Sequence, residues 1–316
     1  MRTITLEEHY ATPAFVEGPG RHLRGDAELA AALCDVGDGR IAAMDAAGID
    51  VQVLSLTAPG VEQLPPDDAV VHARAANDAV AEAVRRHPDR LAAFAAVPTP
   101  APERAAEELE RAVRTLGLKG AVISGHVAGR YLDDRFFEPV LERAQALDVP
   151  IYLHPTPPPA PVRDTYYGGF APDVSHAFAT GAWGWHIETA VHVVRLVLGG
   201  VFDRLPRLQV VIGHMGEALP FMLPRLDVAL PVAVTKLARP VGAYLRENVH
   251  YTFAGFNWTS TFLPLVQQVG VDRIMFSADH PYRSMADARA FLDAVPVSPA
   301  DRDRIAHANA ERLLRL

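Results

Sequence analysis

Five side chains that can bind a metal ion or move a proton follow short apolar runs of the sequence. A lone histidine after such a run is more often a hydrogen-bonded loop residue, but acidic and imidazole groups at several equivalent positions point to one shared site. Carboxylate, imidazole and water ligands suit Zn²⁺, Mn²⁺ or Fe²⁺. The pattern therefore predicts a divalent metal site, formed by Glu7 and His9 after the first run, His154 ending IYLH, His214 ending VVIGH, and Asp279 after IMFS.

The first two of these residues have the spacing of neighbours on one face of a strand. Side chains alternate along a strand, so Glu7 and His9 can both point to the same side. Cys34 is the only cysteine, which excludes a thiolate metal cluster and an intramolecular disulfide.

The rest of the chain alternates short β-rich runs with segments of helical length, as parallel sheets built from βα units do. Eight such units favour a closed (β/α)₈ barrel, the TIM barrel of the α/β class, in which the carboxyl ends of the strands meet at one face. We expect a single domain over residues 1–316, with the five residues at that face. The expected strands are Thr3–Leu6, Val51–Leu56, Leu91–Ala96, Gly120–Ile123, Pro150–Leu153, Gln209–Ile212, Val249–Phe253 and Arg273–Phe276, and the expected helices include Asp67–Arg86, Ala101–Thr115, Asp134–Ala146, Trp185–Leu198, Pro220–Val234 and Ser260–Val269.

Two stretches interrupt the repeat, after the first and the fifth strand. Residues 10–38 are rich in Gly, Pro and charge, and residues 155–183 are rich in Pro and aromatic side chains. Segments this long in a compact domain are usually lids or disordered, and the aromatic content favours lids. Trp183, at the end of the second stretch, is a candidate for the lining of a flat pocket, although aromatic residues also simply fill cores.

Composition excludes several other classes of protein. The chain has 30 Lys and Arg against 38 Asp and Glu, a net charge of −8, and no basic run that would neutralise a nucleic acid. No glycine-rich nucleotide-binding motif follows an early strand. The first residues lack a secretory apolar run, and no uninterrupted apolar stretch is long enough to cross a membrane. We expect a cytoplasmic protein with no organic cofactor.

Several segments carry a family resemblance. The opening LEEHY, the segment VPIYLHP, the stretch from GWHIETAVHVV to VVIGHMGEALPF, the block DRIMFSADHPY and the terminal HANAERLLRL together resemble the amidohydrolase-related decarboxylases. The similarity spans nearly the whole chain and is strongest to the branch that contains γ-resorcylate, 2,3-dihydroxybenzoate and 5-carboxyvanillate decarboxylases.

The resemblance implies roles for these residues. Glu7, His9, His154 and Asp279 match the ligands of one divalent ion, Zn²⁺ or Mn²⁺, and Asp279 also matches the group that handles the proton. Many hydrolytic relatives instead open with His-x-His and carry a bridging lysine at the end of strand four, which here reads KGAVISGH. A single ion is therefore expected. His214 matches the histidine beside the substrate, hydrogen-bonded to Glu217, and the two are expected to act in catalysis.

Four further residues are expected to contact substrate. Arg225 resembles the arginine that meets the carboxylate or a ring oxygen, and Ser124 stands near a position where relatives can carry asparagine. Trp183 is a candidate through its aromatic face. His192, one helical turn beyond Glu188, is a candidate hydrogen-bond partner, and a purely structural role is equally open for it.

The reaction expected from this resemblance is the non-oxidative decarboxylation of an ortho-hydroxylated aromatic acid, with CO₂ lost after protonation of the ring carbon. Metal-dependent hydrolysis of a lactone or amide would use nearly the same residues. A barrel that only binds an aromatic acid is the third alternative, although plain binding requires no set of ligand-type residues at strand ends. The resemblance also implies a homodimer or homotetramer, with the helices around Ala190–Leu198 or Ala218–Leu230 as contact surfaces.

Overall fold

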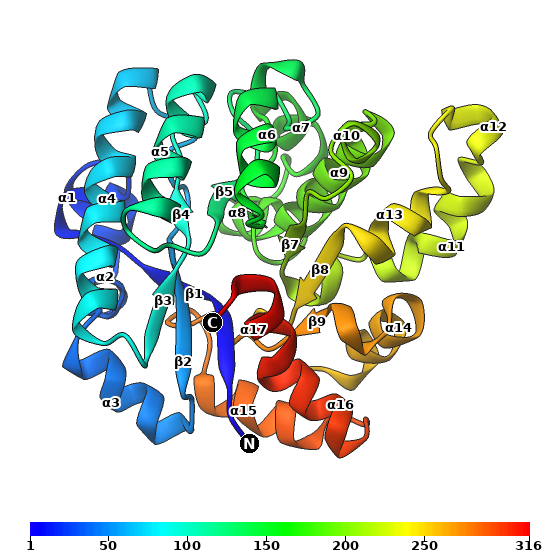
Figure 1. Ribbon diagram of the computed structural model, residues 1–316. Coiled ribbons are helices and arrows are strands. Elements are labelled where there is room, and N and C mark those ends of the chain that lie inside the picture. The colour runs from blue at the N-terminus through cyan, green and yellow to red at the C-terminus, as the bar shows by residue number, and fades with distance from the viewer.

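The computed structural model describes residues 1–316 as a ring of parallel strands surrounded by helices (Figure 1). Every pair of neighbouring strands is parallel, and the order around the ring follows the order in the sequence. The strands are β1 (Ile4–Tyr10), β2 (Val51–Leu56), β3 (Leu91–Ala93), β4 (Ala95–Ala96), β5 (Ala121–Ser124), β6 (Ile151–His154), β7 (Val210–Ile212), β8 (Val249–Thr252) and β9 (Ile274–Met275).

Two backbone contacts reduce these nine segments to eight barrel strands and close the ring. Phe94 separates β3 from β4 and donates its N–H to Leu54 O at 2.8 Å, so the two segments form one continuous edge. Leu6 N–H donates to Phe276 O at 3.1 Å, which joins the first strand to the last. The expected (β/α)₈ architecture is thus confirmed, and the expected third strand is present with an interruption in its middle.

Helices cover the outside of the ring and α17 covers one end (Figure 1). A cluster of buried apolar side chains inside the ring includes Leu6, Val53 and Val211, and it is closed by Ala310 and Leu314 of α17. The larger core lies between strands and outer helices. The longer helices are α2 (Ala27–Cys34), α3 (Asp38–Ala47), α4 (Pro66–Arg86), α5 (Pro102–Arg114), α6 (Glu138–Leu147), α8 (Pro172–Ala179), α9 (Gly184–Leu198), α11 (Leu219–Ala229), α14 (Thr259–Val269) and α15 (Met285–Ala294).

The shorter helices mostly join these elements. One expected helix, Pro220–Val234, is divided in two, because Pro231 has no N–H to continue the helical bonding. No helix combines the length and the apolar character needed to cross a membrane. The shorter helices are α1 (Pro13–Glu17), α7 (Ala160–Tyr166), α10 (Val201–Arg204), α12 (Val232–Thr235), α13 (Val241–Glu247), α16 (Pro299–Asp303) and α17 (Asn309–Leu314).

The two stretches that interrupt the repeat are partly helical. Residues 10–38 contain α1, a 3₁₀ turn at Arg21–Gly25 and α2, and residues 155–183 contain α7 and α8. Thr12 and Asp26 cap α1 and α2 by accepting backbone N–H groups with their side chains. Both stretches follow carboxyl ends of strands, so they lie on the face at which the chemical residues were expected.

Candidate metal centre

The first strand departs from regular alternation at Glu7. Leu6 pairs with Val53 and Glu8 with Leu54, which leaves Glu7 as an extra residue in a bulge with φ of +70°. Bulges re-aim side chains and are common beside active sites. The strand therefore does not follow the regular alternation that was expected between Glu7 and His9. The bulge nevertheless brings both side chains to the same group of potential metal ligands.

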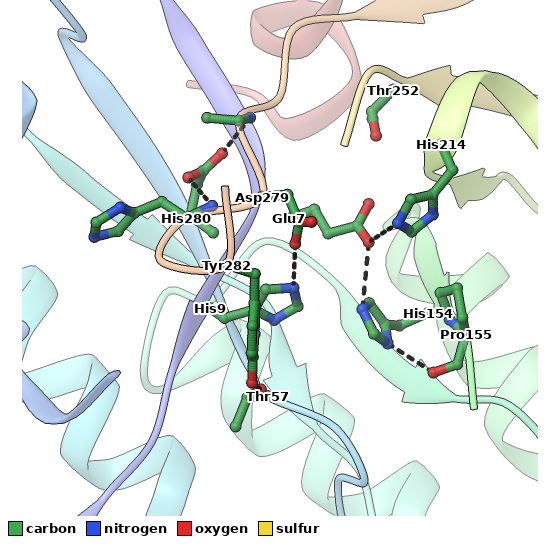
Figure 2. A network of polar contacts seen from close by, with 12 residues as sticks. Glu7, His9, Thr57, His154, Pro155, His214, Thr252, Asp279, His280 and Tyr282 are labelled. Atoms are coloured by element: carbon green, nitrogen blue, oxygen red, sulfur yellow. Dashed lines mark hydrogen bonds and ion pairs between the residues drawn. The ribbon is translucent and has the colours of Figure 1, made fainter. Parts of the chain in front are cut away.

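Glu7, His9 and His154 gather at the carboxyl end of the barrel, with ligand atoms all within 4.8 Å of one another (Figure 2). His154 Nε2 lies 3.3 Å from Glu7 Oε1, and His214 Nε2 lies 3.8 Å from the same oxygen. Asp279 Oδ1 lies 3.2 Å from His9 Nε2. All five residues proposed for the chemistry thus come from four strands, β1, β6, β7 and β9, to one cluster.

The donor atoms of this cluster fit a bound cation. Glu7 Oε1 and both ring nitrogens of His9 are buried and have no hydrogen-bond partner in the chain. Buried polar atoms are normally paired, so three unpartnered ones in a cluster call for an external ligand. A carboxylate oxygen and imidazole nitrogens without thiolates are a donor set for Mn²⁺ or Zn²⁺.

The protonation states favour the same conclusion. Burial lowers the pKa of His154 well below its ordinary value, so the imidazole is neutral, the form that binds metals. Its Nδ1–H donates to Pro155 O at 2.8 Å, which leaves the Nε2 lone pair toward Glu7. Burial also raises the pKa of Glu7 to about 8. A divalent cation beside this carboxylate would offset the cost of desolvating it.

A second chain of hydrogen bonds fixes His214 beside the cluster. His214 Nδ1 lies 2.7 Å from Glu217 Oε1, and Glu217 Oε2 lies 2.6 Å from His186 Nδ1. His186 Nε2–H donates a hydrogen bond to Gly181 O at 3.0 Å. Burial raises the pKa of Glu217, but His214 and His186 outweigh it and lower the value overall. Glu217 therefore stays a carboxylate and orients His214 toward Glu7.

The backbone of this turn is in an unusual conformation. His214, Met215, Glu217 and Ala218 have φ values of +51°, +55°, +55° and +65°, in the left-handed region. Non-glycine residues adopt that region at a cost of about 1 kcal/mol or more, and such residues cluster at functional sites. This turn lets the side chains of His214 and Glu217, only three positions apart, hydrogen-bond to each other.

These groups open into a cavity of about 660 Å³. The two stretches that interrupt the repeat form part of its wall. His22, Leu23, Gly25, Asp26 and Leu29 come from the first, and Pro157, His176, Thr180 and Gly181 from the second. The remaining lining residues are His9, Thr57, Ala58, Pro59, His154, Trp185, His186, His214, Ala254, Phe256, Asp279, Tyr282 and Arg283.

The four expected substrate contacts lie elsewhere in the chain. Ser124 is buried behind Glu62, whose Oε1 accepts the Ser124 N–H at 2.9 Å. His192 Nε2 accepts the Leu132 N–H at 2.9 Å, which is the structural role. Trp183 is 51% exposed, and Arg225 is exposed on α11. None of the four lines the cavity.

Residues other than these four line the cavity where substrate would be contacted. Trp185, two residues beyond Trp183, lines the cavity and has an Nε1–H without a partner. Tyr282 also lines it, and its hydroxyl lies 2.6 Å from Thr57 Oγ1. Sequence reasoning missed Tyr282 and Arg283, whose only signal was their closeness to Asp279. His280 meets the site through its backbone, since its O accepts the His9 N–H at 2.7 Å.

Comparison with known proteins agrees with this geometry. Residues 26–316 match the amidohydrolase family. The chain belongs to that family. The chain is 39% identical over 328 residues to γ-resorcylate decarboxylase of Rhizobium radiobacter, an alignment that covers 99% of the chain and 98% of the relative.

Two solved structures are also similar to this chain. The dihydroxybenzoic acid decarboxylase of Polaromonas, with bound manganese and the inhibitor 2-nitroresorcinol, has a TM-score of 0.91 and 37% identity over 100% of this chain and 97% of that one. The 5-carboxyvanillate decarboxylase of Sphingomonas paucimobilis has a TM-score of 0.93 and 33% identity over 100% and 99%. The family membership and the barrel fold inferred from the sequence are thus confirmed.

His186→Ala should lower kcat by roughly 10-fold to 100-fold, because Glu217 loses the partner that fixes it and His214 loses its orientation. Bound metal should stay unchanged, since His186 belongs to the second cluster and not to that of Glu7, His9 and His154. Steady-state kinetics and metal analysis on the same preparation test this. His186→Gln, which keeps a hydrogen-bond donor near Glu217, should restore part of the lost activity. Equal activity of His186→Ala and the unmodified chain would show that His186 does not position Glu217 and His214 for catalysis.

Proposed function

We propose that this chain is a metal-dependent, non-oxidative decarboxylase of an ortho-hydroxylated aromatic carboxylic acid. The observation that carries the proposal is the cluster of buried atoms without hydrogen-bond partners, Glu7 Oε1 and the two His9 ring nitrogens. Beside them, His154 and Asp279 line the cavity together with His9. The similar proteins named above are decarboxylases of hydroxylated benzoic acids, which supports the same reaction class here.

One divalent ion is proposed to be held by Glu7, His9, His154 and Asp279. When bound, the ion supplies positive charge that stabilises the anionic oxygens of an ortho-hydroxybenzoate. Manganese in the Polaromonas relative supports Mn²⁺, and the donor set suits Zn²⁺ as well. The chemistry proposed below requires no organic cofactor.

Asp279 is proposed to supply the proton that replaces CO₂. As a carboxylic acid it forms the new C–H bond at the ring carbon that bears the carboxylate, while the ortho oxygen pushes electrons into the ring. The C–C bond then breaks, its electron pair restores the aromatic ring, and CO₂ leaves. Direct loss of CO₂ from the aromatic ring would instead leave an aryl carbanion with no electron sink. Asp279 lines the cavity, which is the position this step requires.

His214 and Glu217 are proposed to assist from the other side of Glu7. The neighbouring charges decide the protonation state of His214: burial lowers its pKa, but Glu217 and Glu7 outweigh burial and raise it to about 10. A protonated imidazole can hold an anionic oxygen of the substrate or relay a proton. Hydrolysis of a lactone or amide by the same residues has less support, because the similar proteins named above are decarboxylases.

The test is to load the purified chain with Mn²⁺ and supply 2,6-dihydroxybenzoate. We expect equal amounts of resorcinol and CO₂, in the absence of oxygen and without any organic cofactor. Chelation should abolish the reaction, and Mn²⁺ should restore it. Hydrolysis of members of a lactone panel, with no CO₂ from any hydroxybenzoate, would overturn the proposal in favour of the hydrolase.

We propose further that the chain is one domain over residues 1–316, works in the cytoplasm, and forms a homodimer or homotetramer. Support for the oligomer comes from exposed apolar side chains on the two helices expected as contact surfaces. Val191 on α9 is 43% exposed, and Phe221 and Val228 on α11 are 79% and 73% exposed. Exposed apolar clusters of this kind mark interaction surfaces.

A further inference from the structure

A second cavity, the basic cavity, lies at the end of the barrel opposite the metal cluster. Its volume is about 530 Å³, and it shares no lining residue with the cavity described above. Three of its lining residues stand at the amino ends of neighbouring strands, since Gln209 directly precedes β7, His250 is the second residue of β8 and Arg273 directly precedes β9. Arg312 comes from α17, the helix that covers this end of the ring (Figure 1). Active sites of this fold form at the other face, so the basic cavity lies away from the chemistry proposed above.

Positive charge is concentrated in the basic cavity, although the chain as a whole has a net charge of −8. Four arginines and two aspartates line it. One aspartate, Asp148, forms an ion pair with Arg315 and so neutralises one of the arginines. The remaining aspartate is Asp272, whose carboxylate has Arg304, outside the lining, at 3.7 Å. The other three arginines have no carboxylate within 4.0 Å, and they are Arg207, Arg273 and Arg312.

The lining of the basic cavity also contains a buried hydrogen-bond donor that lacks an acceptor. His250 is 4% exposed, and its Nε2 lies 2.9 Å from Arg273 Nη1. A guanidinium nitrogen can only donate, so Nε2 accepts and the ring hydrogen resides on Nδ1. Burial and the charges of Arg273 and Arg312 lower the pKa of His250 to about 3, which keeps the ring neutral. The Nδ1 is buried without a partner in the chain, and buried polar groups are normally paired, so this N–H calls for an external acceptor.

Arg273 is partly buried beside His250 and has donors that the chain does not use. Its Nη1 donates to Gln209 Oε1 at 3.0 Å and to His250, which leaves Nε and Nη2 without a hydrogen bond. Arg312 uses only its Nη2, which has two oxygen acceptors at 2.9 Å. Burial and the charge of Arg312 lower the pKa of Arg273. An anion bound beside both guanidiniums would offset the cost of burial and the repulsion between them.

This set of donors fits a phosphate group better than a carboxylate. A carboxylate is matched by the planar fork of one arginine, whereas the oxygens of a phosphate group accept hydrogen bonds from several directions. The donors of the basic cavity come from separate elements, with Arg273 and His250 from the strand ends and Arg312 from α17. Pockets of about 530 Å³ enclose small organic molecules, so the organic part of a phosphate monoester has space as well.

We propose that the basic cavity is a binding site for a phosphate group, either inorganic phosphate or the phosphate of a small monoester. Arg273 and the Nδ1–H of His250 bind the phosphate oxygens at the buried side, and the exposed Arg207 and Arg312 neutralise its charge from the rim. Arg312 belongs to α17 and Arg273 directly precedes β9, so the bound group ties the closing helix to the barrel and stabilises the fold. The site does not depend on the reaction proposed at the metal cluster.

The test is calorimetric titration of the metal-loaded chain, dialysed free of excess metal, with inorganic phosphate and with the monoester glycerol 3-phosphate at constant ionic strength. We expect saturable binding and an unfolding temperature that rises with ligand concentration. Arg273→Gln should weaken binding by about 10-fold or more, because a charge-assisted hydrogen bond is lost. Arg312→Gln changes an exposed residue of the rim, so it tests the site even if Arg273→Gln does not fold, and it should also weaken binding by about 10-fold. Tighter binding of glycerol 3-phosphate would identify a monoester as the ligand, and equal or tighter binding of inorganic phosphate would identify the free ion.

The matched control is Arg114→Gln, which removes a 68% exposed arginine side chain on the outer helix α5 and should bind both ligands as the unmodified chain does. Phosphate bound at the metal cluster would be unaffected by the arginines of the basic cavity. Undiminished affinity in Arg312→Gln and in folded Arg273→Gln would therefore overturn the site, and so would the absence of saturable binding of both ligands. Acetate should bind far more weakly than phosphate, and equally tight acetate binding that Arg312→Gln weakens would overturn the assignment of the ligand as a phosphate.

Discussion

Asp279→Asn should abolish decarboxylation, with kcat lower by about 10³-fold or more, while the protein still binds its metal. The amide cannot give a carboxylic proton to the ring carbon. It keeps an oxygen near His9, which Asp279 Oδ1 approaches at 3.2 Å. Glu7, His9 and His154 remain as a group of three potential ligands. The measurement is CO₂ release and metal content on the same sample, at saturating substrate so that the loss is one of kcat.

A carboxylate outside the cavity lining provides the control for this substitution. Asp173 is exposed in the first turn of α8, and Asp173→Asn makes the same chemical change without touching the lining. Its kcat should equal that of the unmodified chain. Full activity in Asp279→Asn would take the aspartate out of proton transfer, and loss of both activity and metal would reduce its role to that of a ligand.

The strands and the residues that follow them could be read from the sequence. The runs before His154 and His214 are continuously apolar, because these strands are covered on both faces, and β6 and β7 lie where those runs predict them. Once the strand ends are known, the barrel brings them to one face. The positions of His154 and His214 therefore followed from local pattern and topology alone.

Local backbone conformation could not be read in the same way. The bulge at Glu7 and the left-handed turn from His214 to Ala218 occupy positions that the residue types do not favour, with φ of +70° at Glu7 and +65° at Ala218. Such conformations persist only where surrounding packing enforces them. Glu8, for instance, accepts the Ala278 N–H at 2.8 Å and holds the last loop against the first strand, a contact over 270 positions.

The residues expected to contact substrate lie outside the cavity lining for a related reason. Trp183, His192 and Arg225 lie at or within helices, and which side of a helix meets the cavity depends on how the helix packs and not on its own sequence. Trp185, two residues beyond Trp183, is turned to the cavity. His192 is turned to the Leu132 backbone.

Glu7→Gln should weaken Mn²⁺ binding by about 100-fold or more, because loss of an outer partner of a metal ligand already costs 10-fold to 100-fold and Glu7 is proposed as a direct ligand. Equilibrium dialysis against Mn²⁺ measures the affinity. The matched control is Glu8→Gln, the same change one residue along the same buried strand. Glu8 accepts the Ala278 and His280 N–H groups at 2.8 and 3.2 Å, and the amide oxygen keeps one of these bonds. Its Mn²⁺ affinity should change far less.

Thermal unfolding of the same variant separates a ligand from a structural carboxylate. Burial raises the pKa of Glu7 from 4.5 to about 8 in the metal-free fold, so the ionised form destabilises that fold above pH 4.5, with the full cost reached once the pH exceeds about 8. At pH 9 the metal-free Glu7→Gln chain should therefore unfold at a higher temperature than the metal-free unmodified chain. Added Mn²⁺ should raise the unfolding temperature of the unmodified chain far more than that of Glu7→Gln, because the stability gained from the ion falls with its affinity. If the metal-free variant is instead less stable than the unmodified chain at pH 9, the Glu7 carboxylate stabilises the barrel by itself. That result would contradict the assignment of Glu7 as a metal ligand.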